Sequence, residues 1–308
     1  MKKIINILII LFIVMLSKSI ALENKIILKI ENEIITTIDI FNEINYLKFF
    51  NNELSQLSDQ EIYQIAIQSI SKNKIKKIEI LKNFNKVNLE NEDYLNSVIN
   101  EKLKNLGFKE LKNFKEELTK RKIDFNDLRE KLEIDIIWNQ IIYSKYNDKI
   151  VIKEDELRKN LQNNKNYNQM INLKEIIFEA GDSNEIQSKY DLIKNDIEKI
   201  GFESAAIKYS SSNTAANGGD LGWINESAIN KEILNELKKI SLKSVTKPIR
   251  ISSGFLILQK YDEKKIEENI DLEVELKKLI DYERNQQFNN YSNLYFNKVK
   301  KNLNINAP

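Results

Sequence analysis

The sequence predicts an α+β fold in which helices make up most of the 308 residues and a smaller strand-containing unit lies in the second half. The chain has only 2 prolines and 7 glycines, so residues that break helices are rare. Three of those glycines stand together in residues 217–223 (NGGDLGW). Glycine adopts positive φ and allows close backbone approach, so this stretch is expected to form a shaped turn that presents Leu221 and Trp223.

The first half of the chain reads as short strands followed by helices. Residues 24–35 alternate loosely and predict two short strands joined by a turn, with Thr36 or Thr37 capping the next helix. Residues 58–61 (SDQE) form a capping box, which predicts the start of a long helix. Further helices are expected over 91–106, closed by Gly107, over 109–120, and from Asp124 onward.

The helix that begins at Asp124 becomes apolar on most of its sides between Ile134 and Tyr143. A helix that is apolar nearly all round is usually buried at the centre of a bundle, so this segment is expected to be core. A partly open groove that takes in hydrophobic client segments is the alternative interpretation.

The second half is expected to contain a separate unit. A short helix over 152–166 fades into asparagine-rich sequence, where we place a linker. The elements that follow are a strand at 170–178, helices at 184–200 and 202–209, the glycine turn, a helix at 225–240, and strands at 247–251 and 254–261. A last helix over 270–303 carries apolar stripes, and these need another surface to cover them.

The first 21 residues predict a secretory signal peptide. Lys2 and Lys3 precede the apolar stretch 4–16, and small residues Ser19 and Ala21 occupy the two positions that a signal peptidase reads. We expect cleavage after Ala21, release into the bacterial periplasm, and no stable membrane insertion afterwards. An uncleaved anchor is the alternative, but the apolar stretch is shorter than the ~20 residues that span a bilayer.

Composition excludes several classes of function. The 48 basic and 46 acidic residues nearly balance, so no nucleic-acid partner is expected. The chain has no cysteine, which excludes disulfides and a lipid-modified cysteine. It also has no histidine, which excludes Ser-His and Cys-His nucleophile pairs and the usual zinc ligand sets. We therefore expect no metal and no other cofactor.

Three motifs at fixed spacing resemble the parvulin (PpiC-type) family of peptidyl-prolyl isomerases. They are the glycine turn at 218–223 (GGDLGW), residues 245–249 (VTKPI) and residues 253–258 (SGFLIL), and they match without a gap from Gly219 to Leu258. The opening of the mature chain also resembles SurA-type periplasmic chaperones. The combined resemblance implies a mostly helical chaperone domain plus a parvulin-like domain with a small antiparallel sheet and surrounding helices.

Together with the signal peptide predicted over residues 1–21, the resemblance implies the domain boundaries. Residues 22–165 would be the helical domain and 168–263 the parvulin-like domain. Residues 266–303 would form a C-terminal helix that packs back on the helical domain.

The resemblance also assigns site residues by position. It implies that Leu221, Ile229 and Ile233 line the slot for the proline ring, and it adds Trp223 and Phe255 as substrate-binding residues. Ser212 falls where the family has Asp or Cys, and Ser253 falls where it has Ser or Thr, so these two are the candidate catalytic residues. The two family histidines are replaced here by Glu175 and Leu256.

These replacements leave the function open between two classes. The first is a folding chaperone that binds unfolded or nascent exported polypeptides, above all outer-membrane proteins, with the parvulin-like domain as a peptide-binding or structural module. The second is an active, weak prolyl cis-trans isomerase acting on exported proteins. A parvulin-fold domain with an unrelated scaffolding role is a third possibility. The absence of histidine favours the first class over the second.

Overall fold

A computed structural model describes residues 24–84, 86–87, 89, 91–163, 169–265 and 272–307. The expected signal peptide and most of the expected asparagine-rich linker lie outside the described residues. Among the helices that are described, none is both long and apolar enough to cross a membrane.

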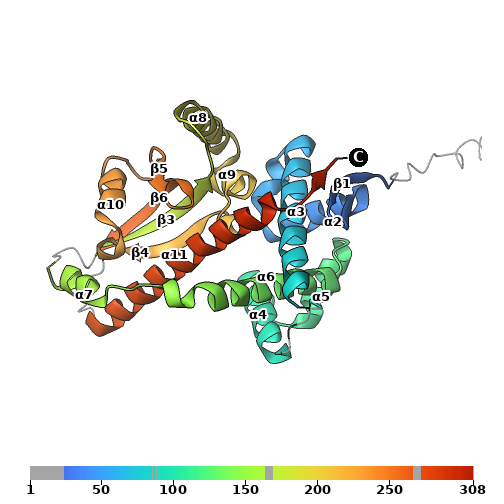
Figure 1. Cartoon of the computed structure of the whole chain (residues 1–308), viewed down its shortest axis with the longest axis horizontal. Coiled ribbons are helices and arrows are strands. Elements are labelled where there is room, and N and C mark those ends of the chain that lie inside the picture. Colours follow the sequence, from blue (N-terminus) through green and yellow to red (C-terminus); the bar gives the residue numbers. More distant parts are fainter. Residues whose placement is uncertain are drawn as a thin grey trace, which may run out of the picture.

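The two ends of the described chain meet in one small sheet. Strands β1 (Ile26–Ile30) and β2 (Glu33–Thr36) pair antiparallel, as predicted, and β7 (Ile305–Asn306) pairs antiparallel with the other edge of β1. Figure 1 shows the C-terminus lying beside β1. Strand β7 was not predicted, because two residues are too few for a strand pattern to be seen.

The predicted helices of the first half are present. They are α2 (Thr37–Phe50), α3 (Asp59–Asn83), α4 (Glu92–Asn105), α5 (Leu111–Lys120), α6 (Phe125–Tyr146) and α7 (Glu154–Asn163), with short 3-10 turns η1 (Asn52–Gln56) and η2 (Asn147–Lys149). Both Thr36 and Ser58 form capping boxes with the residue three positions on. Gly107 has a φ of 82°, and the amide of Phe108 donates to the carbonyl of Leu103, which closes α4 as expected.

Helix α6 lies in the core of this half, as its apolar sequence predicted. Trp138 is fully buried, and Ile134, Ile137, Ile141 and Ile142 are buried with it. Tyr143 is an exception, since 56% of its surface is exposed. The core interpretation is therefore confirmed for most of the segment.

The second half contains a four-stranded antiparallel sheet in the order β4-β3-β6-β5. Its elements are β3 (Gln169–Phe178), α8 (Ser183–Ile200), α9 (Phe202–Tyr209), η3 (Asn213–Asn217), β4 (Asp220–Asn225), η4 (Glu226–Ala228), α10 (Lys231–Lys238), β5 (Ile249–Ile251) and β6 (Gly254–Lys265).

The sequence prediction missed β4 and placed a helix over 225–240, where the structure has η4 and the shorter α10. The physical reason is the glycine stretch. Gly219 has a φ of 76°, and a Cβ there would lie 2.2 Å from the carbonyl oxygen of Glu175. This close approach lets the Glu175 amide donate to the Gly219 carbonyl at 2.7 Å, so the turn leads directly into a strand on the edge of β3.

Helix α11 (Leu272–Lys301) runs across both halves of the molecule (Figure 1). In its C-terminal part, Tyr295 and Val299 join the core of the first half, and Trp138 Nε1 donates to Ser292 Oγ at 2.9 Å. In its N-terminal part, Leu276 and Leu279 pack with Leu161 of α7. The predicted apolar stripes are thus covered by two different sets of partners.

Candidate functional site

The sheet of the second half has two differently covered faces. In the β3–β6 register, Glu175 pairs with Leu258 and Ile177 with Leu256. Side chains alternate along a strand, so these residues share one face. Ile176, Phe178 and Ile257 lie on the other face, where they pack with residues of α8 and α9.

The first face brings together the three residues expected to line a proline slot. Leu221 of β4, Ile229 after η4 and Ile233 of α10 belong to the same apolar cluster as Leu256 and Leu258. The structure therefore supplies an apolar surface at this place, although their role in binding substrate stays a prediction.

Glu175 is held in this face by two hydroxyl groups. The carboxyl is buried, with 3% of the residue exposed, and its Oε1 accepts hydrogen bonds from Ser212 Oγ at 2.6 Å and from Thr214 Oγ1 at 2.8 Å. Burial raises the pKa of Glu175 above its ordinary value, while the two donated hydrogen bonds act in the opposite direction. Ser212, itself fully buried, therefore serves as a donor to Glu175.

Tyr282 of α11 packs against the same cluster and lies close enough to Glu175 to sense its charge. Burial raises the pKa of Tyr282 well above its ordinary range, and the neighbouring Glu175 raises it further. A side chain from the C-terminal helix thus packs against the apolar cluster that contains the residues predicted to line the proline slot.

The structure does not bring Phe255 and Trp223 to this face. Phe255 packs in the opposite cluster, where its ring centroid lies 5.8 Å from that of Phe178. The prediction overlooked side-chain alternation, because Phe255 is adjacent to Leu256 and so points the other way. Trp223 is adjacent to Ile224, which belongs to the apolar cluster with Leu256, so the Trp223 side chain points to the other face. Trp223 is 37% exposed, and Lys264 Nζ lies 4.0 Å from its ring centroid.

Ser253, the second candidate catalytic residue, lies in the turn between β5 and β6 and is 4% exposed. Its Oγ donates to Asn290 Oδ1 of α11 at 3.3 Å. The Ser253 hydroxyl is therefore hydrogen-bonded to the C-terminal helix, and the Ser212 hydroxyl is hydrogen-bonded to Glu175.

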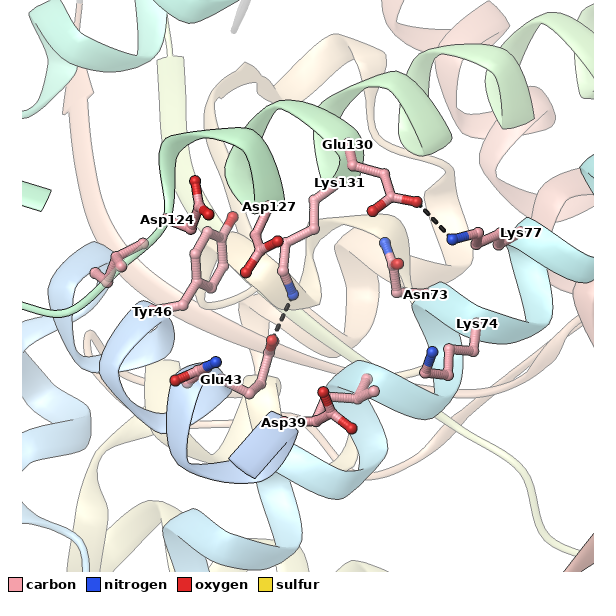
Figure 2. Close-up of a pocket in the computed structure, with 13 residues that line it drawn as sticks. Asp39, Glu43, Tyr46, Asn73, Lys74, Lys77, Asp124, Asp127, Glu130 and Lys131 are labelled. Atoms are coloured by element: carbon pink, nitrogen blue, oxygen red, sulfur yellow. Dashed lines mark hydrogen bonds and ion pairs between the residues drawn. The ribbon is translucent and has the colours of Figure 1, made fainter. Parts of the chain in front are cut away.

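A second candidate site lies between α2, α3 and α6 (Figure 2), where acidic and basic side chains surround a pocket of about 150 Å³. Its charges are largely paired: Lys131 with Glu43, Lys77 with Glu130 at 2.6 Å, and Lys74 with Glu33 at 2.6 Å. Across the described part of the chain, no group of three or more His, Cys, Asp or Glu side chains could hold a metal ion. This pocket therefore reads as a set of structural ion pairs.

Two residues of the parvulin-like site were missed by sequence reasoning. Thr214 lies two positions after Ser212, and the short spacing was a usable signal. Tyr282 had no such signal, because it follows Glu175 by more than one hundred positions and reaches it only through the path of α11.

Residues 170–262 match the family model described as the rotamase, PPIC-type PPIASE domain. The chain is also similar to the chaperone SurA of Pseudomonas putida, with 25% identity over 170 residues that cover 52% of this chain and 40% of that protein. SurA of Xanthomonas oryzae pv. oryzae is 36% identical over 75 residues, which cover 24% of this chain and 16% of that protein. The chain spans less than half the length of these curated relatives.

Among solved structures, the chain is similar to one from a study of PEB4 and the periplasmic protein Cj1289, described as two structurally related SurA-like chaperones of Campylobacter jejuni. The identity is 18%, the alignment covers 92% of this chain and 99% of that one, and the TM-score is 0.38.

Proposed function

Since residues 170–262 form a PPIC-type PPIASE domain and the chain is related at modest identity to the SurA chaperones, we propose that this protein is a folding chaperone of the bacterial periplasm. It binds unfolded segments of exported polypeptides, with outer-membrane proteins as the expected clients. Its parvulin domain serves binding and structure more than isomerisation.

This proposal rests on what occupies the sheet face that carries Glu175 and Leu256. Isomerisation needs an open apolar slot and polar groups that favour the twisted amide of the transition state. The Leu256 side chain cannot hydrogen-bond, Glu175 already accepts hydrogen bonds from Ser212 and Thr214, and Tyr282 packs against the apolar cluster to which the predicted slot residues belong. Each hydrogen bond missing from the transition state lowers the rate up to roughly tenfold.

The helical part is the proposed holding unit. We propose that residues 22–165 and 266–303 fold as one unit, and the Trp138–Ser292 hydrogen bond supports this division. The β1–β7 pairing adds a contact between β1 and residues 305–306, just beyond the C-terminal segment. Replacing residues 168–263 by a short Gly/Ser linker is expected to leave a soluble protein that still suppresses client aggregation. A folded linker variant without holding activity would remove the assignment to the helical part.

The proposed location rests on the N-terminal sequence. Lys2, Lys3 and the apolar stretch 4–16 support export, and Ser19 and Ala21 support cleavage. Sequencing of the periplasmic protein is expected to begin at Leu22, whereas a full-length membrane-retained product would contradict the proposal.

A weak prolyl isomerase is the second candidate, favoured by the grouping of Leu221, Ile229 and Ile233 in one apolar cluster. Two assays on the mature chain separate the candidates. A protease-coupled assay with a Xaa-Pro peptide is expected to show little acceleration, and light scattering is expected to show suppressed aggregation of a diluted, unfolded outer-membrane protein. Strong isomerase activity without holding would reverse the assignment.

A variant that carries both Glu175→His and Leu256→His serves as a gain-of-function control. It restores the residue type that the family has at both positions, so any isomerase activity that appears identifies these two replacements as the cause of the loss. Leu258→His, a neighbouring position on the same face, is the matched control and is expected to gain nothing.

A further inference from the structure

A cleft of about 590 Å³ lies where the helical part meets the parvulin domain. One side is formed by α2, η1, α3, α4 and α6, and the other by residues of α9 and η3. Its lining combines apolar residues, side-chain amides and lysines. The apolar residues include Leu47, Phe50, Leu106 and Ile207.

The cleft contains more positive than negative charge. Four lysines and one acidic residue line it. Lys76 Nζ pairs with Asp135 at 2.6 Å, and Lys131 pairs with Glu43, which is not one of the residues that line the cleft. Lys72 Nζ instead donates to the backbone carbonyl of Ser212 at 3.2 Å.

Lys102 completes the set, with its ammonium group 5.0 Å from the ring centroid of Phe50. Among the described residues, neither Lys72 nor Lys102 forms an ion pair with a carboxylate. Two of the four ammonium groups therefore lack a carboxylate partner, in a place partly shielded from solvent.

The two ammonium groups without a carboxylate partner line the same cleft as Asp135. Although burial alone would raise it, the pKa of Asp135 is lowered, first by Lys76 and then by Lys72 and Lys102. Three lysines from α3 and α4 thus act on a single carboxylate of α6. A second anion beside Asp135 would meet the same cations, and the two unpaired ammonium groups would offset its repulsion from Asp135.

We propose that this cleft binds a carboxylate-bearing peptide segment, with the carboxylate between Lys72 and Lys102 and an adjacent apolar side chain against Phe50 and Leu106. This inference rests on the proposed function and specifies the class of segment that is bound. A peptide fits better than a small inorganic anion for two reasons. Amides such as Gln68, Asn105 and Asn139 line the cleft and can both donate to and accept from a peptide backbone. The apolar residues would gain nothing from an inorganic anion.

The carboxylate can come from an Asp or Glu side chain or from a chain end. Calorimetric titration with three hexapeptides separates these sources. The first is acetylated and amidated with a central Phe-Glu, the second has Phe-Gln in its place, and the third has Phe-Gln with a free C-terminal carboxylate. The wild type is expected to bind one or both carboxylate peptides about tenfold more tightly than the neutral peptide.

Lys102→Met is expected to abolish that preference, and Lys102→Arg is expected to keep it. Lys104→Met is the matched control, because Lys104 lies on the same helix and is exposed. Asp135→Asn is expected to strengthen carboxylate binding, since it removes the competing anion while leaving the lysines in place.

Binding is also expected to depend on pH. Burial, and after it the nearby Lys76, lower the pKa of Lys72 to about 7, while Asp135 acts to raise it. A bound carboxylate favours the ammonium form, so affinity for the Phe-Glu peptide is expected to rise as pH falls from 8 to 6. The other charged groups that line the cleft around Lys72 are Lys76, Lys102, Lys131 and Asp135.

Equal binding of charged and neutral peptides, or a preference that survives Lys102→Met, would overturn the inference. Competition of inorganic phosphate with the Phe-Glu peptide at similar affinity would overturn it as well. Because the light-scattering assay with an unfolded outer-membrane protein is independent of peptide charge, such a result would leave the chaperone proposal standing. Loss of holding activity in the wild type would instead refute the chaperone proposal itself.

Discussion

The two faces of the four-stranded sheet are buried by different parts of the chain. The face that carries Ile176, Phe178 and Ile257 is covered by α8 and α9, the two helices that follow β3 directly. The face that carries Glu175 and Leu256 is covered by α10 and also by Tyr282 of α11, which lies beyond the end of the parvulin domain.

This difference separates a local core from a shared one. The face covered by α8 and α9 is built from one continuous stretch of sequence. The face that carries Glu175 and Leu256 is completed only when the C-terminal helix is in place. Further contacts add to the dependence, since Asn225 Nδ2 donates to Glu275 Oε1 at 3.1 Å and Ser253 Oγ donates to Asn290. The face that resembles an isomerase site is therefore the one whose own core is completed by α11.

Truncation after Lys265, which removes α11, is expected to have the largest effect on stability. Among the described residues it removes four buried hydrophobic side chains, those of Leu276, Leu279, Tyr295 and Val299. Their burial contributes roughly 6–12 kcal/mol before conformational entropy is counted, which approaches the ~5–15 kcal/mol total stability of a typical protein. The truncated chain is expected to aggregate or to unfold at a clearly lower temperature, measured by circular dichroism and size-exclusion chromatography.

A point variant tests the same dependence in a chain that still folds. Tyr295→Ala removes a buried ring that lies 5.5 Å from the ring of Trp138, so a loss of about 3 kcal/mol is expected. Leu294→Ala on the same helix removes a side chain that is 41% exposed and should cost less than about 1 kcal/mol. Equal effects in urea unfolding would mean that α11 does not complete the core.

Tyr282→Ala is expected to act on the shared face alone. Removing this partly buried ring should cost about 2 kcal/mol and uncover part of the apolar cluster that contains Leu221, Ile229 and Ile233. A proline-containing peptide should then bind measurably more tightly by calorimetry than it binds the wild type. Tyr261→Ala, whose side chain is 43% exposed on β6, is the control and should change neither quantity. Unchanged peptide binding after Tyr282→Ala would show that Tyr282 does not block the slot.

Glu175→Gln is expected to stabilise the protein at neutral pH. The pKa of Glu175 is raised in the folded state by burial, so the stability linked to its protonated form is complete below the unfolded value near 4.5. That stability is lost as pH rises through the folded pKa. Glutamine keeps the acceptor for Ser212 and Thr214 without the charge.

The gain from Glu175→Gln is expected to be larger at pH 8 than at pH 5 and to vanish near pH 4, because Glu175 is protonated in both the folded and the unfolded state at low pH. Urea unfolding at these pH values measures it. A variant less stable than the wild type at pH 8 would mean that the charged form of Glu175 is favoured by the fold.

The sequence predicted most of the local structure because its signals are local. The capping residues Thr36 and Ser58 and the closing Gly107 each act within one helical turn, and all three predictions are confirmed. The prediction failed where a contact depends on distant residues. The strand β4 forms because Gly219 approaches β3, and Phe255 turns away from the slot because of the β3–β6 register.

The candidate site divides in the same way. Glu175 and Ser212 were singled out by position, and the structure joins them through a hydrogen bond. Tyr282 could not be found from sequence, since a tyrosine on an amphipathic helix carries no sign of the surface it will meet. The cleft between the helical part and the parvulin domain was not predicted, because Lys72 and Lys102 come from separate helices.

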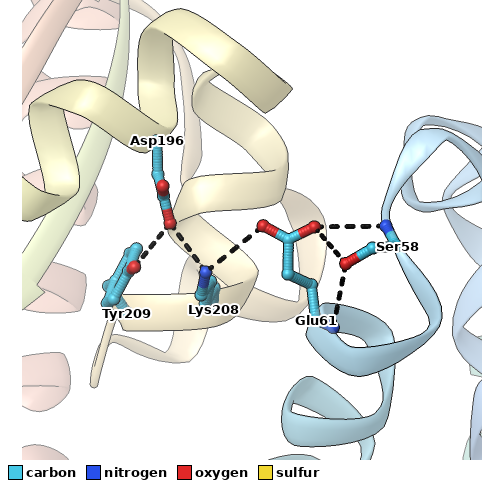
Figure 3. A network of polar contacts seen from close by, with 5 residues as sticks. All are labelled: Ser58, Glu61, Asp196, Lys208 and Tyr209. Atoms are coloured by element: carbon cyan, nitrogen blue, oxygen red, sulfur yellow. Dashed lines mark hydrogen bonds and ion pairs between the residues drawn. The ribbon is translucent and has the colours of Figure 1, made fainter.

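The smallest expected change in stability concerns the polar contacts that join α8 and α9 to helix α3 of the helical part (Figure 3). Lys208 of α9 lies 3.7 Å from Glu61 of α3, and both Lys208 and Tyr209 donate to Asp196 of α8. Glu61 and Lys208 are 32% and 18% exposed at the side chain, so their ion pair is weak in water.

Glu61→Gln retains an acceptor for the Ser58 cap and should change stability by less than about 0.5 kcal/mol, with no added dependence on salt. Asp196→Asn, in which a buried acceptor loses its charge, is the contrasting variant and should cost about 1–3 kcal/mol. A loss above 1 kcal/mol for Glu61→Gln would mean that this polar link, and not α11 alone, holds the two halves together.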